Sequence, residues 1–341
     1  MATLKRASEQ LFQRSPDERF DSFGELWDHC QREKRFSCDL WQTPQTMAPK
    51  AGGGQVTVEL NGDGLHRLTD WSFSQLCRLS GVHKETINRL SAETASKALS
   101  ETLPSTSKPI QLLTAGKSVR SLHGVSYTRL WNADLLSVVS EFATDFQPPQ
   151  KGCGGATGLY CGEQDLFAFL IDPTGWAEIE GEAFAPGFFV WNSEVGRRSL
   201  GIQTFWFQSV CQNHIVWDAT EVVEFTRKHT AKVGDGLNEI RRLIERLVAK
   251  RDERRDGFVR VVSRAMQQRL GDKADDAVKE LIANGIPGGA AKAATELAQQ
   301  NGRLTVFSLV DALTRLAQEV RYAGDRTELD AKAASLLALA A

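Results

Sequence analysis

The sequence predicts an α+β fold with a central antiparallel sheet, an N-terminal helical segment and a helical C-terminal region. Residues 105–233 contain short runs of β-branched and aromatic residues that are separated by turn formers. Apolar residues recur at helical spacings before this region, over 70–104, and again after it, over 234–341. A chain of 341 residues can bury two or three packed units of this kind.

Residues 1–69 are predicted to form an N-terminal arm and linker with short helical patches. The stretch TPQTMAPKAGGGQ, residues 43–55, combines two prolines with three consecutive glycines. Both residue types interrupt helices and strands. We therefore expect a loop or linker over this stretch.

Residues 70–104 are predicted to be a short helical segment that resembles a helix-turn-helix. In FSQLCRLSGVHKETINRL, residues 73–90, Gly81 stands between two helical patterns, where a turn needs an unhindered backbone. Lys84, Thr86 and Asn88 would then face outward from a second, DNA-reading helix. Two short packed helices explain the same spacing, so a structural role stays open.

Residues 105–233 form the predicted β-rich core, interrupted by one helix in NADLLSVVSEFATDF. The segment 200–226 predicts a hairpin that turns near Gln212 and Asn213, since Asn tolerates the positive φ of tight turns. Strand alternation places Trp206 on one face and Phe205 on the other. Either both faces are covered by other layers, or one face stays open and Trp206 stacks on unpaired bases.

Residues 234–341 form the predicted helical C-terminal region. Its first helix carries an apolar stripe from Leu237 to Val248, and Phe258 resumes that stripe further along the chain. We expect a long helix whose stripe packs on the sheet or on a neighbouring subunit. A homo-oligomer follows from the second arrangement.

The composition is that of an ordinary globular protein, with 25% charged residues and a formal net charge of −2. No long apolar run opens the sequence or occurs within it, so we expect a cytoplasmic protein. Six cysteines are scattered along the chain, a pattern that predicts reduced thiols.

Charge is distributed unevenly along the chain. Residues 151–196 carry one basic against seven acidic residues, whereas residues 225–269 carry thirteen Lys and Arg against six Asp and Glu, a net charge of +7. Cations bind phosphates, and aromatic rings stack on bases. The predicted nucleic-acid-binding residues are Arg120, Arg129, Arg197, Arg198, Trp206, Arg227, Lys228, His229, Lys232, Arg242, Arg246 and Lys250.

The last three of these cations continue to Arg254 at i, i+4 spacing, so they share one helix face. Acidic residues lie among them, and a solvated helix with its own ion pairs explains the same pattern. Sheet edges also carry cations that discourage aggregation. Both readings stay open.

A thiol-based enzyme is a further alternative. The sequence allows a nucleophilic cysteine with a histidine base, or a zinc site across the predicted hairpin turn. We expect neither a metal nor another cofactor, and no catalysis. The candidates for this chemistry are Cys161 or Cys211 as nucleophile, His123, His214 or His229 as base, and Cys153, Cys161, Cys211 and His214 as zinc ligands.

An ordered set of segments resembles the phage- and plasmid-borne proteins of the Domain of Unknown Function 932 family. The resemblance covers roughly residues 14–233 and depends on the order of the segments more than on any one of them. The segments are RSPDERF, DWSFSQLCRLSGV, SVRSLHGVSYTRLWNADLL, NSEVGRRSL, VCQNHIVW and RKHT.

The resemblance implies a mobile-element setting, in which such proteins occur beside replication and recombination genes. Together with the cations and aromatic strands, it favours a non-catalytic single-stranded DNA-binding protein that supports strand annealing or recombination. A helix-turn-helix regulator of duplex DNA is the alternative, and a Cys/His enzyme is the third hypothesis. The near-zero net charge argues against the first.

Overall fold

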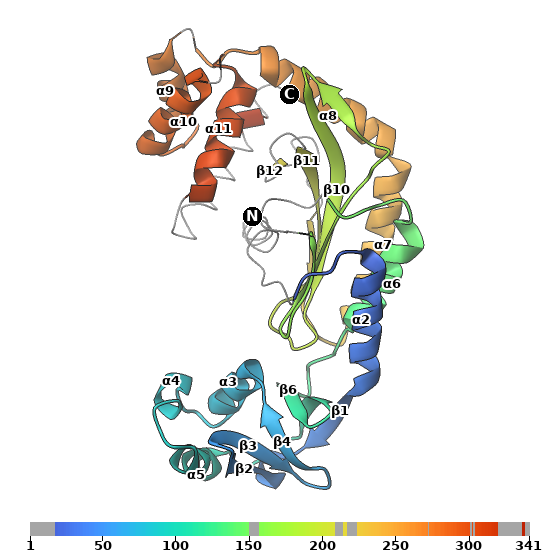
Figure 1. Cartoon of the computed structure of the whole chain (residues 1–341), viewed down its shortest axis with the longest axis vertical. Helices are drawn as coiled ribbons and strands as arrows, with labels where there is room; N and C mark the ends of the chain where they lie inside the picture. The colour runs from blue at the N-terminus through green and yellow to red at the C-terminus, as the bar shows by residue number, and fades with distance from the viewer. Residues whose placement is uncertain are drawn as a thin grey trace.

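The computed structural model describes residues 18–149, 157–208, 214–216, 224–271, 273–300, 302, 304–319 and 336–337. These residues form two β-sheets and a series of helices, so the predicted α+β class is confirmed. Figure 1 shows an elongated molecule with a smaller sheet at one end, a larger curved sheet in the middle and a group of helices at the other end.

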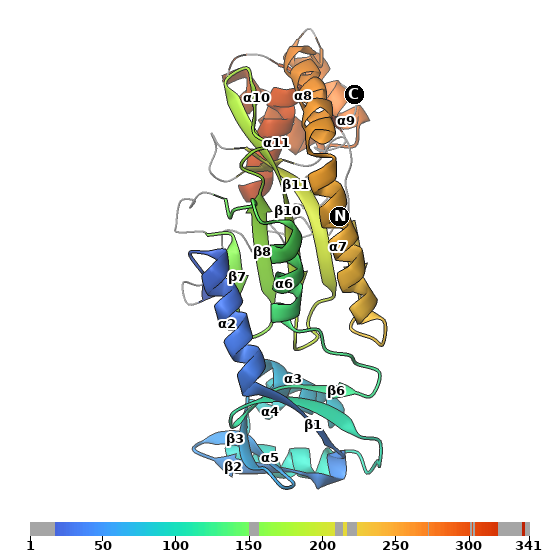
Figure 2. The same ribbon diagram turned by 90° about the vertical axis from the view of Figure 1, so that its right-hand side faces the viewer.

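Helix α2 (Phe23–Phe36) joins the two sheets. The Ser22 hydroxyl accepts a hydrogen bond from the backbone N–H of Glu25 and so caps the helix. The helix contacts α6 and β7 of the larger unit, and its last residue leads directly into β1 (Ser37–Gln42) of the smaller sheet. Figure 2 shows α2 running from one unit to the other.

The smaller sheet has six strands in the order β1-β5-β6-β4-β3-β2, antiparallel except for the β4–β6 pair. Three helices contribute to its core, in which Leu76, Leu99 and Leu112 are fully buried. The remaining elements of this unit are β2 (Met47–Gly52), β3 (Gln55–Leu60), β4 (Gly64–Leu68), α3 (Asp70–Leu79), α4 (Lys84–Ile87), α5 (Ala92–Thr102), β5 (Ile110–Ala115) and β6 (Ser118–Gly124).

The predicted linker over residues 43–55 is wrong, because most of these residues form a β-hairpin. Gly53 and Gly54 have positive φ and make the tight turn between β2 and β3. Pro49 is tolerated because β2 lies at the edge of the sheet, where a missing N–H costs no ladder bond. The Pro- and Gly-rich composition therefore marks a turn and an edge strand.

The predicted DNA-reading helix is also wrong. Helix α4 has only four residues, too few to lie along a major groove. The Lys84 ammonium is paired with the Asp70 carboxylate of α3, and Ile87 is buried in the core of the smaller unit. The segment is thus two short packed helices.

The larger sheet is antiparallel throughout, with the path β12-β11-β10-β8-β7. Two short strands extend it: β9 pairs with β10, and β13 pairs with the start of β11. Gln208 lies opposite His214, which confirms the predicted hairpin, while its turn near Gln212 lies outside the described residues. The strands are β7 (Leu159–Cys161), β8 (Leu166–Ile171), β9 (Ala177–Ile179), β10 (Glu182–Asn192), β11 (Leu200–Gln208), β12 (His214–Val216) and β13 (Glu224–Arg227).

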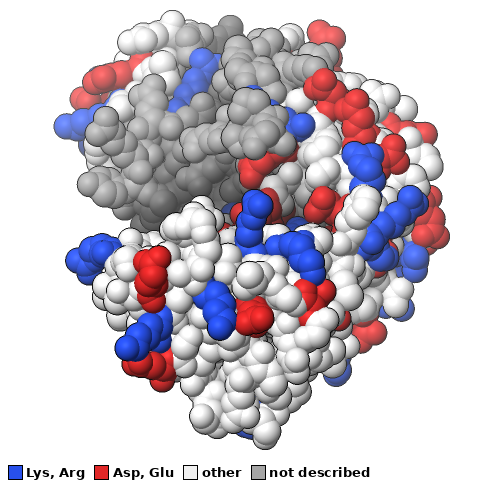
Figure 3. Space-filling view, turned by 60° about the horizontal axis from the view of Figure 1, so that its bottom comes forward, with Lys and Arg blue, Asp and Glu red and all other residues white. Residues whose placement is uncertain are grey.

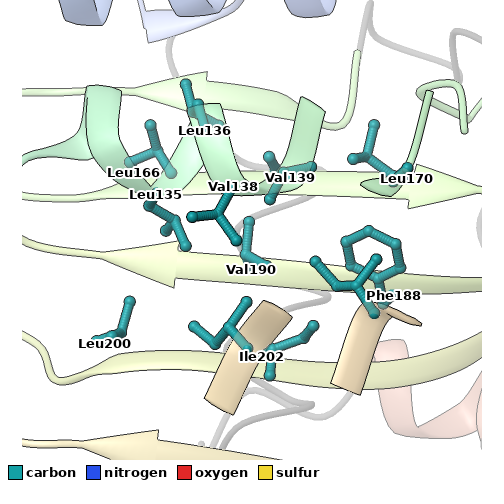
Figure 4. Close-up of a cluster of buried hydrophobic side chains, with 14 of the residues drawn as sticks. Leu135, Leu136, Val138, Val139, Leu166, Leu170, Phe188, Val190, Leu200 and Ile202 are labelled. Carbon is teal, nitrogen blue, oxygen red and sulfur yellow. The ribbon is translucent and has the colours of Figure 1, made fainter. Parts of the chain in front are cut away.

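Helices cover one face of the larger sheet. Figure 4 shows Leu135 and Val138 of α6 (Asn132–Phe142) above Val190 and Ile202 of the strands. Helix α7 (Val233–Ala249) packs beside α6 and adds Ile240 to this core. The helical stripe predicted from the sequence therefore packs on the sheet.

The opposite face of the larger sheet is aromatic and buried, with Phe169, Phe189 and Phe205 in mutual contact. Trp206, on the helix-covered side, is 0% exposed and stacks on Phe258 with ring centroids 3.8 Å apart. The predicted base-stacking role of Trp206 is therefore wrong. Its ring belongs to the core between the sheet and a C-terminal helix.

The C-terminal region is helical, as predicted, but its first helix is interrupted at Lys250. Phe258, Val262, Leu281 and Leu309 form the centre of its core. No described helix is long and apolar enough to cross a bilayer. The remaining helices are α8 (Arg251–Gln267), α9 (Ala274–Ala283), α10 (Gly288–Gln300) and α11 (Val306–Glu319).

Candidate functional site

The candidate site lies where the two units meet, and we call this region the junction. It combines the chain between β6 and α6, the connection from β10 to β11, and the end of β13. Leu200 pairs with Arg227 at the sheet end, and the backbone N–H of Thr128 donates to the carbonyl of His229 at 3.2 Å. Segments that are far apart in the sequence are thereby brought together.

A stack of three rings organises the junction. The rings of His123 and Tyr127 are nearly parallel at 3.6 Å, and His229 follows at 5.5 Å from Tyr127. Gly196 fits against this stack because it has a φ of +70° and because a Cβ there would lie 2.6 Å from the His123 ring. Burial lowers the pKa of His123 and the pKa of His229 to about 4.

This stack predicts a loss of stability in mild acid. Both histidines are neutral when folded at pH 7, and in the unfolded chain the pKa of each returns to about 6.5. Protons therefore bind the unfolded state preferentially as the pH falls from 6.5 toward 4, which costs roughly 3 kcal/mol per ring. Thermal unfolding between pH 7.5 and 4.5 measures the effect.

A variant with His123→Phe and His229→Phe supplies the control. Its unfolding temperature should fall less steeply over this pH range than that of the original chain, because two of the titrating groups are gone. Equal slopes for both proteins would contradict the prediction.

Glu194 is the polar centre of the junction and is 2% exposed. One carboxylate oxygen lies 3.2 Å from the Arg120 guanidinium, and the other accepts the backbone N–H of Asn132 at 2.9 Å. Its carbonyl accepts bonds from the Tyr127 hydroxyl and the Arg129 guanidinium. Burial raises the pKa of Glu194, and the Arg120 charge opposes that rise.

Arg120 and Arg129, two of the predicted phosphate-binding residues, form ion pairs within the protein. Arg120 is 8% exposed and bridges Glu33 and Glu194. The Arg129 side chain is 2% exposed and pairs with Asp39 of β1 at 2.6 Å. These ion pairs connect the smaller sheet to the larger unit, so neither cation is available to a nucleic acid.

A pocket of about 520 Å³ opens beside Glu194. Its walls come from α2, from β5 and β6 of the smaller sheet, and from the start of α6 and the end of β7. Four glutamates and one arginine line it, so it is acidic overall. Its lining includes His29, Cys30, Glu33, Asn132, Cys161 and Glu163.

Two thiols meet at the wall of this pocket. The Sγ atoms of Cys30 and Cys161 are 3.9 Å apart, and the Asn132 amide nitrogen lies 3.8 Å from the Cys161 sulfur. Hydrogen bonds from the Cys30 thiol and the His29 ring lower the pKa of Cys161 to about 7, although burial opposes the shift. The hydrogen bond with Cys161 and burial both raise the pKa of Cys30.

The sequence singled out Cys161 but not its neighbours. His29, rather than His123 or His229, is the histidine beside Cys161. His29 and Cys30 lie far upstream on α2, and nothing in their local pattern points to a thiol site. The described part of the chain contains no group of three or more His, Cys, Asp or Glu placed to hold a metal.

The proposed zinc ligands cannot be placed in full. Cys153 and Cys211 lie outside the described residues, as does the side chain of His214. Cys30, Cys38, Cys77 and Cys161 are free thiols in this structure. No disulfide joins any two of these four, and the reduced state of the thiols stays a prediction.

The remaining predicted cations fall into two groups. Several are engaged in the fold: Arg198 pairs with Asp165, and His229 is buried in the ring stack. Arg242 of α7 lies 3.5 Å from Glu239, and Lys250, which follows the last residue of α7, lies 3.9 Å from Glu253. The residues with no ion pair to another described residue are Arg197, Arg227, Lys228, Lys232 and Arg246.

Four of the cations without an ion pair to a described residue gather at the junction: Arg197, Arg227, Lys228 and Lys232. We call them the junction cations. Arg197 and Lys228 are exposed, and the Arg197 guanidinium lies 5.2 Å from the ring centre of Trp71. Figure 3 views the molecule from the end that carries the smaller sheet, and basic and acidic side chains alternate over that face.

Trp71 was not predicted from the sequence as a site residue. Its indole N–H donates to the carbonyl of Val195 at 2.8 Å, which fixes the half-buried ring beside Arg197. Trp71 is the second residue of α3, which Thr69 caps, so its local sequence indicates only a helix start.

Comparisons of the chain with protein-family models, with curated proteins and with solved structures found no match.

Proposed function

We propose that the protein binds single-stranded nucleic acid at the junction, without catalysis, and so supports strand annealing or recombination. The observation that carries the proposal is the pairing of the start of β11 with β13, which brings the junction cations to one end of the larger sheet. None of these cations has an ion pair to a described residue, so their charges are available to attract phosphates. Trp71, with Arg197 above it, offers a nearby planar surface for a base.

A single strand suits this arrangement better than a duplex. The face in Figure 3 carries mixed charge in its described part, so it lacks the broad basic surface that tracks a double helix. Helix α4 is too short to enter a major groove. A flexible strand can instead bend to reach four cations and one aromatic ring.

Helix α7 contributes less to this proposal. Arg242 and Lys250 are compensated by acidic neighbours, and Arg246 is the only one of the three without a described ion-pair partner. We propose Arg246 as a peripheral contact. A homo-oligomer would place several junctions along one strand, and mass photometry with and without an oligonucleotide tests that assembly.

The experiment is fluorescence anisotropy with labelled single- and double-stranded oligonucleotides of matched sequence over a salt series. We expect the single strand to bind more tightly and to lose affinity with salt. Contacts from the four junction cations correspond to a slope of log K against log salt of about −3. No binding of either form at low salt would contradict the proposal.

The variant Arg197→Ala/Lys228→Ala/Lys232→Ala tests the site itself. Removal of three phosphate contacts should weaken binding and reduce the salt slope by about 2. The matched control, Lys50→Ala/Lys97→Ala/Lys279→Ala, removes three exposed lysines that pair with acidic neighbours elsewhere on the protein. Equal slopes for the two variants would move binding away from the junction.

A further inference from the structure

We propose that Cys161 is an oxidation-sensitive thiol and that Cys30 resolves its oxidised form into an intramolecular disulfide. The two sulfur atoms are 3.9 Å apart, and both residues line the junction pocket. This site is independent of the nucleic-acid proposal.

The two cysteines come from separate elements that pack against each other. Cys30 lies on α2 and Cys161 ends β7, and the two elements are in contact. A disulfide has an S–S distance of about 2.05 Å, so the sulfurs must approach by roughly 2 Å. That approach needs side-chain rotation and a small shift of one helix against one strand.

The surroundings of Cys161 favour its thiolate. The His29 ring, the Cys30 thiol and the Asn132 amide group are its polar neighbours, and each can donate a hydrogen bond to sulfur. Burial and the Glu194 carboxylate act against the negative charge. A thiolate that is held by donors at a pocket wall is the form that attacks a peroxide.

The pocket supplies access for a small oxidant. Cys161 is 8% exposed and Cys30 is 1% exposed, so neither sulfur projects from the surface. Both nevertheless line a cavity of about 520 Å³, which is large enough for a hydroperoxide. The other described thiols lack this combination, since Cys38 is exposed and Cys77 lies in the core of the smaller unit.

Disulfide formation takes place in two steps. The Cys161 thiolate attacks the terminal oxygen of a hydroperoxide and the O–O bond breaks, which gives a Cys161 sulfenic acid. The departing alkoxide, or hydroxide from hydrogen peroxide, takes a proton from solvent and leaves as an alcohol or as water. The Cys30 sulfur then attacks the Cys161 sulfur, the S–OH bond breaks, and water leaves with the Cys30 proton. The hydroperoxide is reduced by two electrons, and the two thiols are oxidised to one disulfide.

Oxidation of Cys161 would change the hydrogen bonds at the centre of the junction, because Asn132 contacts both Cys161 and Glu194. Its side-chain nitrogen contacts Cys161, its side-chain oxygen accepts from Asn192 at 2.8 Å, and its backbone N–H donates to Glu194. A disulfide removes the thiolate acceptor from this chain of contacts. We therefore expect the temperature of unfolding to differ between the reduced and oxidised proteins.

Peptide mass spectrometry of the full chain after treatment with hydrogen peroxide tests the proposal. We expect a cross-linked peptide pair that joins Cys30 to Cys161 and is released by dithiothreitol. The Cys30→Ser variant should instead accumulate added oxygen on Cys161, because the resolving thiol is missing. Absence of the cross-linked pair, or links only between other cysteines, would overturn the proposal.

The pH dependence of alkylation by iodoacetamide gives a second readout that needs no cysteine variant. Cys161 should react with a midpoint near pH 7, and the exposed thiol of Cys38 serves as the internal reference. His29→Gln should raise the Cys161 midpoint by about one unit or more. A Cys161 midpoint at or above that of Cys38 would overturn the assignment of Cys161 as the reactive thiol.

Discussion

Glu194→Ala is expected to destabilise the protein by about 3 kcal/mol or more, because it removes the buried one of the two carboxylates that pair with the Arg120 guanidinium. Glu194 is 2% exposed and holds Arg120 and the backbone of Asn132. The Arg120 charge would then keep only Glu33 at 3.4 Å. Thermal unfolding followed by circular dichroism should show a midpoint lower by several degrees.

Glu163→Ala is the matched control, because Glu163 is an exposed glutamate that lines the same pocket. Its loss should change the midpoint by less than about 1 °C, as expected for a solvated surface charge. If both variants unfold at the same temperature as the original chain, Glu194 does not hold the junction together.

Trp206→Ala is expected to cost about 3–5 kcal/mol, the range for removal of a large buried aromatic ring. The ring is 0% exposed, stacks on Phe258 and belongs to the core that joins the sheet to the C-terminal helices. Urea unfolding at neutral pH measures the loss. Trp206→Phe should cost less, because it keeps a ring and removes an indole N–H that has no hydrogen-bond partner among the described residues.

The same variants separate a core role from a binding role. Trp41, which is 50% exposed on β1, supplies the control: Trp41→Ala should leave stability nearly unchanged. Folded Trp206→Phe should bind a single-stranded oligonucleotide as the original chain does, since the ring is inaccessible. A selective loss of binding with intact stability would return Trp206 to the binding surface.

The sequence predicted the elements well where periodicity was strong. The alternation in 200–208 placed Trp206 and Phe205 on opposite faces, and they lie in different cores. The stripe from Leu237 packs on the sheet with α7. Its interruption at Lys250 was missed, because apolar spacing continues across the break while the backbone does not.

The site was predicted less well, since long-range contacts decide which charges are free. The sequence grouped Arg197 and Arg198 with Arg227 and Lys228, and strand pairing brings them to one sheet end. It could not show that Arg198 pairs with Asp165. Nor could it place Trp71 beside Arg197, because 126 positions of chain separate the two residues.

Composition and periodicity by themselves determined the α+β class, the β-rich middle and the helical C-terminal region, because these depend on local preferences and on one buried face per element. Only the tertiary structure decided that Trp206 lies in the core and that Glu194 accepts hydrogen bonds from Arg120 and Arg129. It also decided that the Cys30 sulfur lies beside the Cys161 sulfur. Contacts between segments that are distant in the sequence decide which side chains are buried and which charges are paired. They therefore decide which polar groups remain available for binding or chemistry.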